Sequence, residues 1–547
     1  MKKLQDVLKD WEAVIGLEVH TELTALDTKM FCNCRLSHDD APNTNVCPVC
    51  LGMPGALPVP NKKAIESIVM AGLATNCEIQ KHSMFYRKHY FYPDMAKNFQ
   101  TTQGPVAFCM YGHLDLEVSG DGAKERPEGI VTGQDTVAAH DQPHPVTPER
   151  AADGSYTVPI RILRIHMEED AAKMVHIGGE EGRITAATES LIDYNRCGTP
   201  LIELVTEPDL RTPEEARLFM EKLQQTFRTL GISDCSLENG SMRCDGNVSL
   251  RRRGTTKLGT KTELKNINSF KSLHDGLEYE ICRQAEVLEE GGIVYQETRH
   301  WEPSRRRTVV MRVKETADDY RLFPDPDLAP FDLTDDFIEE ARARIPELPD
   351  AKAARYVAEL GLKRADARQI AGDPQTAALF EDAVAAANAA AKKNAAGKRG
   401  EKDAAGEKDA AGEKDAAKLV STVANVIVNL VPGHAGVTAA QVASLSALLA
   451  TDAITFAQAR EVLDAVDGTD EDPEAVVDAR GMRQVTDTSA LEPVVDEVLA
   501  RCTDQVRQYH DGNKKVVGYL VGQCMKASRG QGNPKLFNQL LRQKLEA

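Results

Sequence analysis

The chain has 547 residues, more than one hydrophobic core usually organises, so two to four domains are expected. An apolar content of 42% and a charged content of 27% are typical of a soluble globular protein. The net charge of −18 argues against a protein whose whole surface binds nucleic acid, although it allows a local basic face. No apolar run is long enough to cross a bilayer, and the opening MKKLQDVLKDWEAV lacks the apolar centre of a secretory signal.

The first segment with chemical character is a strand predicted in residues 14–22, which read VIGLEVHTE. Two-residue alternation places Leu17 and its apolar neighbours on one face and Glu18, His20 and Glu22 on the other. Carboxylates beside an imidazole are suitable ligands for a divalent cation. The strand therefore predicts one side of a cation site.

Four cysteines follow this strand closely, as Cys32-x-Cys34 and, twelve residues later, Cys47-x-x-Cys50. Two close pairs at this spacing can surround one Zn²⁺ tetrahedrally. The alternative is that these four residues are unpaired thiols without a metal. The remaining cysteines are scattered singly along the chain, as in a reduced cytoplasmic protein. We predict a structural zinc, because nothing nearby offers an open coordination position.

Two helices are predicted from their apolar faces, at residues 61–77 and 212–230. Thr212 is expected to cap the second helix, with Glu215 completing a capping box and Gly231 following its end. The Gly-, Pro- and Asp-rich residues 120–154 are expected to form a long surface loop.

A second acidic strand end is predicted in RILRIHMEEDAAKMV, residues 161–175. Alternation puts His166, Glu168 and Asp170 on one face, and three adjacent acids repel one another unless a cation binds. Alone, the segment is equally compatible with an exposed acidic turn. Together with Glu18 and His20 it favours a Mg²⁺ or Mn²⁺ site.

Further polar strand faces are predicted around Glu203 and Asp245, followed by Lys265 and other scattered basic residues. Taken singly, such basic residues are more often a solvated face. Acids for a metal and bases for phosphate oxygens together are what phosphoryl transfer requires. GTTKLGTK at residues 254–261 is not a P-loop, because a threonine separates the second glycine from the lysine, and it is interpreted as a hairpin turn.

From residue 334 the sequence becomes alanine-rich and helical. The repeated EKDAAG, within an insertion at about 388–417, has no apolar face and is expected to be disordered or partly helical. We predict an α+β protein with three parts: a strand-rich cradle (1–330), a helical domain (331–484) and a small helical tail (485–547). The tail carries a basic surface expected to bind a polyanionic partner, with a solvated helix face as the alternative: Lys526, Arg529, Lys535 and Arg542.

Many blocks of the chain together resemble one family. In order they are GLEVH, the cysteine cluster, YFYPDMAKNFQ, HMEEDAAK, NRCGTPLIE, EPDLRTPEEA, RCDGNVSL, TELKNINSF, QETR, DYRLFPDPDL and GYLVGQCMKASRGQGNPKLFNQLLRQKL. Nearly the whole chain is similar to the B subunits of the aspartyl/glutamyl-tRNA(Asn/Gln) amidotransferases. It departs from the family pattern at Ala172, usually Gly, and Gly246, usually Ala, and in the insertions before residue 160 and at EKDAAG.

The resemblance implies an ATP- and Mg²⁺-dependent enzyme of the cytoplasm that phosphorylates the side-chain carboxylate of mischarged Glu-tRNA(Gln) or Asp-tRNA(Asn). Ammonia released from glutamine by the amidase subunit then forms the amide, and a small third subunit, which bridges the other two, makes up a heterotrimer. The resemblance also implies that the basic tail holds the tRNA, and it implies no membrane partner. Whether one or both mischarged tRNAs are substrates stays open.

The resemblance also implies site residues. The metal ligands would be Glu18, His20, Glu169, Glu203 and Asp245, with Lys88 near the nucleotide phosphates. Strict alternation instead points Glu168 toward the side of His166, and we follow the motif for Glu169 on the expectation of a bulge. The competing hypotheses are a non-catalytic, zinc-bearing tRNA-binding protein and a zinc hydrolase, the latter disfavoured because four cysteines would saturate the zinc.

Overall fold

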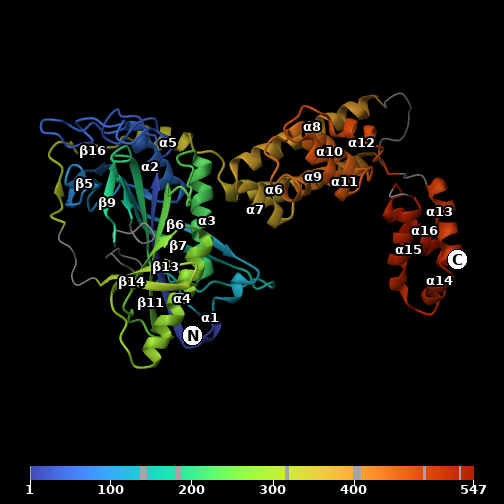
Figure 1. The fold of residues 1–547 in the computed structure, drawn as a ribbon, viewed down its shortest axis with the longest axis horizontal. Coiled ribbons are helices and arrows are strands. Elements are labelled where there is room, and N and C mark those ends of the chain that lie inside the picture. Colours follow the sequence, from blue (N-terminus) through green and yellow to red (C-terminus); the bar gives the residue numbers. More distant parts are fainter. Residues whose placement is uncertain are drawn as a thin grey trace. The chain divides into compact units, whose positions relative to one another are not determined.

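The computed structural model describes residues 2–37, 39–135, 145–178, 186–313, 320–397, 408–484, 488–528 and 531–546. The chain divides into two compact units, residues 1–348 and 349–547. The first unit is strand-rich with a few helices and the second is helical, which confirms the α+β prediction (Figure 1). The first unit extends beyond residue 330 because α5 (Asp335–Ala343) buries Ile338 and Ala341 in its core.

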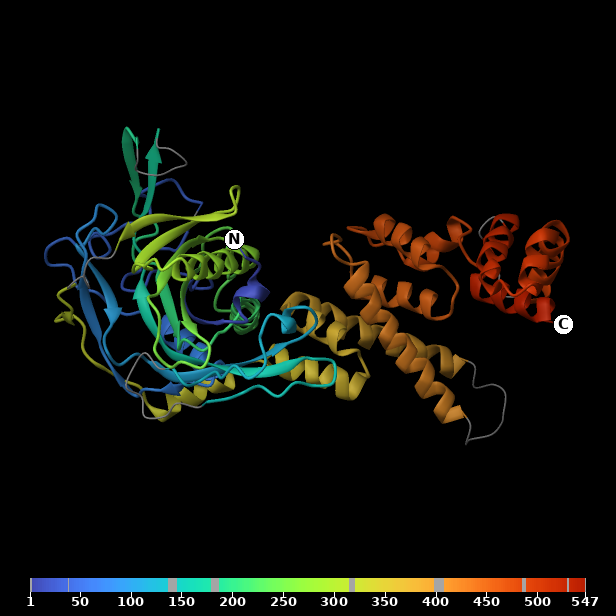
Figure 2. The ribbon, with the colours of Figure 1, turned by 90° about the horizontal axis from the view of Figure 1, so that it is seen from below.

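The first unit is built on a mixed twelve-stranded sheet (Figures 1 and 2). Across the sheet the order is β14 (Arg307–Val313), β13 (Glu297–Glu302), β12 (Thr262–Ile267), β11 (Met242–Arg252), β1 (Trp11–Glu22), β10 (Pro200–Thr206), β7 (Tyr156–Glu169), β5 (Phe99–Gln103), β4 (Phe85–His89) and β15 (Phe323–Pro324). β6 (Cys109–Val118) also pairs with β7, and β2 (Glu78–Ile79) pairs with β6. The β12–β13 pair is parallel, whereas the β1, β7 and β10 pairs are antiparallel.

Two small antiparallel pairs lie outside this sheet. β3 (His82–Ser83) pairs with β16 (Phe331–Asp332), and β8 (Lys173–Ile177) pairs with β9 (Glu189–Asp193). The hairpin predicted at residues 254–261 is present, since these residues connect the antiparallel strands β11 and β12.

One face of the sheet is covered by α2 (Lys62–Ala74), α3 (Pro213–Leu230) and α4 (Phe270–Glu289). In β1 the predicted alternation is present: Leu17 and Val19 are buried in the shared core, and Glu18 and His20 lie on the other face. Burial of the apolar stripe thus fixes the register of β1 and leaves its polar residues together.

The second predicted helix begins and ends as expected, but the predicted capping box is absent. The Thr212 side chain accepts the Glu215 backbone N–H at 3.1 Å, and Gly231 ends the helix with a left-handed φ of 68°. The Glu215 carboxylate, however, accepts from the backbone N–H of Arg211 at 2.7 Å and from the Arg126 guanidinium at 2.7 Å. The charge of Arg126, which comes from a distant loop, holds the carboxylate away from the cap.

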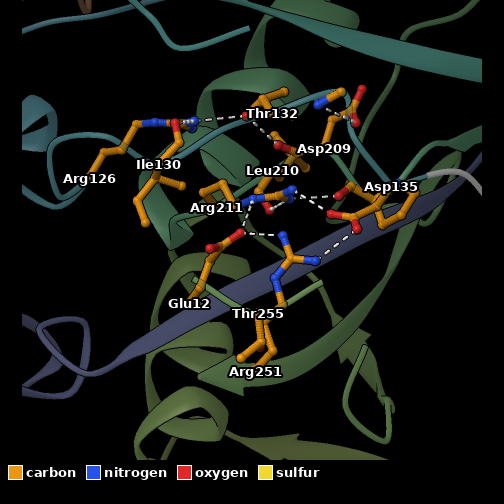
Figure 3. A network of polar contacts seen from close by, with 12 residues as sticks. Glu12, Arg126, Ile130, Thr132, Asp135, Asp209, Leu210, Arg211, Arg251 and Thr255 are labelled. Atoms are coloured by element: carbon orange, nitrogen blue, oxygen red, sulfur yellow. Dashed lines mark hydrogen bonds and ion pairs between the residues drawn. The ribbon is translucent and has the colours of Figure 1, made fainter. Parts of the chain in front are cut away.

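The loop expected on the surface is partly buried, because its charged residues enter an ionic network (Figure 3). Asp135 accepts from Arg211 at 2.7 Å and from Arg251 at 2.8 Å, and both arginines also bind Glu12. All four residues are buried, with exposed fractions of 8% or less. Two buried cations are balanced by two buried anions, so the network attaches the loop to β1 and β11. Residues 136–144 of the same loop lie outside the described residues.

The second unit contains two hydrophobic clusters. The first is formed by α6 (Pro349–Leu360), α7 (Arg364–Ala371), α8 (Pro374–Gly397), α9 (Lys408–Asn429), α10 (Ala439–Ala450), α11 (Phe456–Val466) and α12 (Pro473–Ala479). The second is formed by α13 (Thr488–Arg501), α14 (Thr503–His510), α15 (Val517–Ala527) and α16 (Pro534–Glu546). None of the helices in the described part of the chain combines the length and apolarity needed to span a membrane.

Part of the EKDAAG insertion lies in residues 398–407, outside the described residues. Its described ends belong to α8 and α9, so these ends are helical. Residues 389–392 and 414–418 are exposed, which agrees with the absence of an apolar face in the repeat.

Candidate active site on the polar face of the sheet

Strand pairing brings the predicted acids and histidines together on the polar face. His20 of β1 lies opposite Glu203 of β10, and Glu203 lies opposite His166 of β7. On the other side of β1, Glu18 is paired with Asp245 of β11. Directly opposed residues point to the same face of a sheet, so residues far apart in sequence converge.

The contacts within this group are short and continuous. His20 Nε2 donates to Glu18 Oε1 at 3.2 Å, and its Nδ1 lies 3.9 Å from Glu203 Oε2. His166 Nε2 donates to Glu168 Oε1 at 3.1 Å and lies 3.6 Å from Glu203 Oε2. Two sets of possible ligand atoms lie within 4.8 Å of one another: Glu18, His20 and Asp245, and His20, Glu168 and Glu203. We call these five residues the site cluster.

The electrostatics of the site cluster fit a divalent cation. Burial disfavours a charged imidazole, but the Glu18 hydrogen bond and the charges of Glu203 and Glu168 outweigh it and raise the pKa of His20 to about 9. Burial raises the pKa of Glu203, despite the opposing charge of His166, and the charges of Glu168 and Glu18 raise it further. The carboxylates of the site cluster therefore repel one another, and a bound cation would relieve this repulsion. Carboxylate oxygens together with an imidazole are suitable ligands for Mg²⁺ or Mn²⁺.

Glu168, not Glu169, lies in the site cluster. β7 pairs with β10 in unbroken register through Glu169, so the bulge expected there is absent, and the irregularity falls between Val205 and Thr206. The Glu169 carboxylate pairs with Lys97 and accepts the Thr101 backbone N–H at 2.8 Å. The Glu168 side chain therefore lies on the side of His166, as strict alternation predicts, while the choice between the two glutamates as a metal ligand stays a prediction.

Glu169 instead lines a pocket of about 230 Å³, which it shares with Lys97 and with Lys29 and Cys50 near the cysteine loop. Glu169 is 2% exposed, and its charge is balanced by Lys97, whose side chain is 10% exposed, rather than by the histidines of the site cluster.

Two residues that the sequence analysis missed hold Glu168 in place. Thr102 Oγ1 donates to Glu168 at 2.7 Å, and Gln100 Nε2 donates to it at 3.0 Å. Burial alone would raise the pKa of Glu168, but the hydrogen bond from His166, with nearby positive charge, holds it well below its usual range. The sequence FQTTQ of β5 gives no periodic signal for these roles, which become visible only from the pairing of Thr102 with Glu168.

Two lysines border the site cluster. Lys88 of β4 lies opposite Gln100 of β5 and so shares the face of Glu168, whose pKa its charge helps to lower. Lys265 of β12 pairs with Asp245 and lies 3.4 Å from Glu263. Burial raises the pKa of Asp245, and this lysine only partly offsets the effect.

The four cysteines converge in a separate site. Their sulfur atoms lie within 4.8 Å of one another, and the Cys47 and Cys50 sulfurs are 3.9 Å apart. A hydrogen bond from Cys32, helped by the Cys47 backbone N–H, outweighs burial and lowers the pKa of Cys50 to about 5. Four sulfur donors, one of them held as a thiolate, fit Zn²⁺ in a closed, structural coordination set.

Comparison with known proteins gives the family. The model of the GatB/GatE catalytic domain matches residues 13–339, and that of the GatB domain matches residues 410–545. The aspartyl/glutamyl-tRNA(Asn/Gln) amidotransferase B subunit from Carboxydothermus hydrogenoformans is 42% identical over 538 residues, covering 98% of this chain and 99% of the relative. The protein of the same name from Caldicellulosiruptor saccharolyticus is 42% identical over 537 residues, with coverage of 98% and 99%.

The chain belongs to the GatB family of amidotransferase subunits. It is therefore an enzyme subunit, one component of an amidotransferase that has several, and the family identified from the sequence is confirmed. The catalytic-domain match covers the whole site cluster and the cysteine site.

The GatB-domain match includes the basic tail. Lys526 on α15 and Lys535 and Arg542 on α16 are exposed, and Arg529 lies outside the described residues. Lys535 and Arg542 line an open groove between the two helices, and Lys535 also donates to Asp452 at 2.8 Å. Their role in tRNA binding stays a prediction.

Proposed function

We propose that this subunit transfers the γ-phosphoryl group of ATP to the side-chain carboxylate of Glu-tRNA(Gln) or Asp-tRNA(Asn), so that ammonia can convert it to the amide. Two observations support this. The relatives are named for amidotransferase reactions at these tRNAs, and a polar sheet face gathers the site cluster beside two lysines. The convergence of these charged groups is the observation that carries the proposal.

The chemistry explains why ATP is needed. A carboxylate is a poor acyl donor, because neither of its oxygens leaves readily. One carboxylate oxygen attacks the γ-phosphorus, ADP leaves, and an acyl phosphate forms. Ammonia then attacks the acyl carbon, phosphate leaves with that oxygen, and the nitrogen loses a proton to give the neutral amide.

The site cluster would hold Mg²⁺ through the carboxylates of Glu18, Glu168, Glu203 and Asp245 and the imidazole of His20. When bound, the cation would supply positive charge to phosphate oxygens. Gln100 and Thr102 hold the Glu168 carboxylate in position, and His166 adds a third hydrogen bond. Lys88 and Lys265 place positive charge at two borders of the site, where nucleotide phosphates can be neutralised.

The remaining parts of the proposal concern assembly. Cys32, Cys34, Cys47 and Cys50 would hold a structural Zn²⁺. The amidase subunit would supply ammonia from glutamine, and a small third subunit would make up a cytoplasmic heterotrimer. The helical tail would hold the tRNA, as the basic groove on α16 suggests.

The decisive experiment compares adjacent glutamates. We expect His20→Ala and Glu168→Gln to reduce phosphate release that depends on ATP and mischarged tRNA by at least about a hundredfold. Glu169→Gln should lower the melting temperature, because it removes the charge partner of the largely buried Lys97 side chain, and should reduce phosphate release less.

The matched control is Glu339→Gln, which alters an exposed carboxylate on α5 and should change neither measurement. Normal phosphate release in the Glu168→Gln protein, with strong loss in a folded Glu169→Gln protein, would contradict the site cluster and restore the motif-based assignment.

A further inference from the structure

We propose that Tyr90, Tyr92 and Tyr320 form a stacking surface for the single-stranded 3′ end of the aminoacyl-tRNA. We call these three residues the tyrosine platform. The inference rests on the proposed function, because it assigns a binding surface to the substrate which that function requires.

The tyrosine platform exposes aromatic rings beside a cation. The rings of Tyr90 and Tyr92 are stacked, with centroids 5.7 Å apart and planes inclined by 20°. The Tyr320 ring lies 5.2 Å from Lys88 Nζ. The three tyrosines are 37%, 41% and 39% exposed, although large aromatic residues normally contribute to a core.

Tyr90 and Lys88 lie on the sheet face that carries Glu168 of the site cluster. Tyr90 donates its backbone N–H to Asn98 at 3.1 Å, which continues the β4–β5 pairing beyond His89. Alternation then places Tyr90 on the side of Lys88, which lies opposite Gln100. Gln100 in turn donates to Glu168 of the site cluster at 3.0 Å.

The reacting carboxylate determines which ligand must lie here. It is joined through the amino acid to the terminal ribose of the tRNA, so the last nucleotides must lie beside the site during phosphoryl transfer. Single-stranded bases are unstacked and bind to exposed aromatic rings, while a nearby lysine neutralises the backbone phosphates. A stacked tyrosine pair and a separate third ring offer room for more than one base, which favours the RNA end over the single adenine of ATP.

The test uses the full chain with its partner subunits and a tRNA whose 3′-terminal adenosine is replaced by 2-aminopurine, a base whose fluorescence is quenched by stacking. We expect Tyr92→Ala to weaken binding of this tRNA about tenfold and to restore its fluorescence. Tyr92→Phe keeps the ring and should keep both properties. A second ligand is the same tRNA with its single-stranded 3′ nucleotides removed, which all variants should bind equally.

The matched control is Tyr295→Ala, since Tyr295 is an exposed tyrosine, at 62%, that precedes β13. It should leave affinity and fluorescence unchanged. An equal loss of affinity for the shortened tRNA, or unchanged fluorescence in Tyr92→Ala and Tyr320→Ala, would overturn the proposal.

Two further outcomes would assign the tyrosine platform to another ligand. Loss of co-purification with the partner subunits, with normal quenching, would make it a protein interface, and a higher KM for ATP with normal quenching would make it an adenine site. Quenching does not require phosphoryl transfer. Normal quenching without tRNA-dependent phosphate release would therefore support the platform while contradicting the proposed function.

Discussion

Cys47 and Cys50 approach each other within a loop whose turn is closed by local backbone hydrogen bonds, such as Leu51 N–H to the Cys47 carbonyl at 3.1 Å. Their sulfur atoms are 3.9 Å apart, and Cys32 and Cys34 complete the set. The loop around Cys47 has several exposed residues, so burial of apolar side chains contributes little to its order. A metal that binds all four sulfurs would therefore contribute directly to the stability of the fold.

We predict that Cys47→Ser lowers both the bound zinc and the melting temperature, because a hydroxyl is a much weaker zinc ligand than a thiolate. Elemental analysis and thermal unfolding measure the two effects. The control is Cys235→Ser, a fully buried cysteine away from the loop, which should cost stability but not zinc. Native protein that contains no zinc would contradict the prediction.

Much of the site cluster could be predicted from single residues. Glu18 and His20 follow from alternation in one strand, and Glu203 and Asp245 lie in strands with recognisable polar faces. Alternation also favoured Glu168 over Glu169, and the structure agrees with it. Gln100 and Thr102 were missed because their importance depends on which strands are neighbours, and single-strand periodicity does not contain that information.

At the scale of elements, α4 is connected to the start of α3 by a histidine surrounded by acids. His274 Nε2 donates to Glu125 at 3.0 Å, and Glu125 also accepts the Glu214 backbone N–H at 3.1 Å. The other ring nitrogen lies 3.4 Å from Asp275 and 3.9 Å from Glu278. Burial lowers the pKa of His274, but these acids outweigh it, so the folded pKa is raised.

This arrangement predicts a pH-dependent contribution to stability. The imidazole binds protons more tightly when the chain is folded, so its contribution is complete below the unfolded pKa of about 6.5 and is lost as pH rises through the higher folded pKa. We expect His274→Gln to lower the melting temperature at about pH 6. The difference in melting temperature from the unaltered protein should shrink progressively toward about pH 9.

The appropriate control is His176→Gln, on the exposed β8–β9 hairpin, measured over the same pH range. It should leave the melting temperature nearly unchanged throughout. A deficit of His274→Gln that grows with pH would contradict the prediction, because it would mean that the neutral imidazole makes the stabilising contact.

Elements with strong local signals were predicted well. The α3 helix carries a cap, a proline in its first turn and a terminal glycine, and its bounds match the prediction closely. The failures are tertiary effects. The Glu215 carboxylate accepts a hydrogen bond from Arg126 instead of closing the capping box. The loop that contains Arg126 and Asp135 is partly buried because these residues pair with charged residues of other elements. The polar composition of the loop predicted that it lies on the surface. Composition could not show that Arg126 and Asp135 each have a buried partner of opposite charge.

At the scale of the whole molecule, an acidic chain of net charge −18 presents exposed basic residues on its last two helices. Lys535 and Arg542 lie seven positions apart on α16 and border the same groove. Positions at this spacing share one face of a helix, so their charges act together. A polyanion is the partner that best explains a local positive face on an acidic protein.

We predict that the tail contributes tRNA affinity and not chemistry. Removing the chain from Val485 onward should weaken binding of mischarged tRNA while sparing glutamine hydrolysis by the partner subunit. Phosphate contacts release counterions, so Lys526→Ala and Arg542→Ala should each flatten the dependence of log affinity on log salt by roughly 0.7–0.9. Lys535→Ala should flatten it less, because Asp452 already pairs with this lysine at 2.8 Å.

The control is Lys363→Ala, an exposed lysine before α7, which should leave the slope unchanged. If affinity and slope survive removal of the tail, these residues form only a solvated surface, and tRNA must be held by the rest of the assembly.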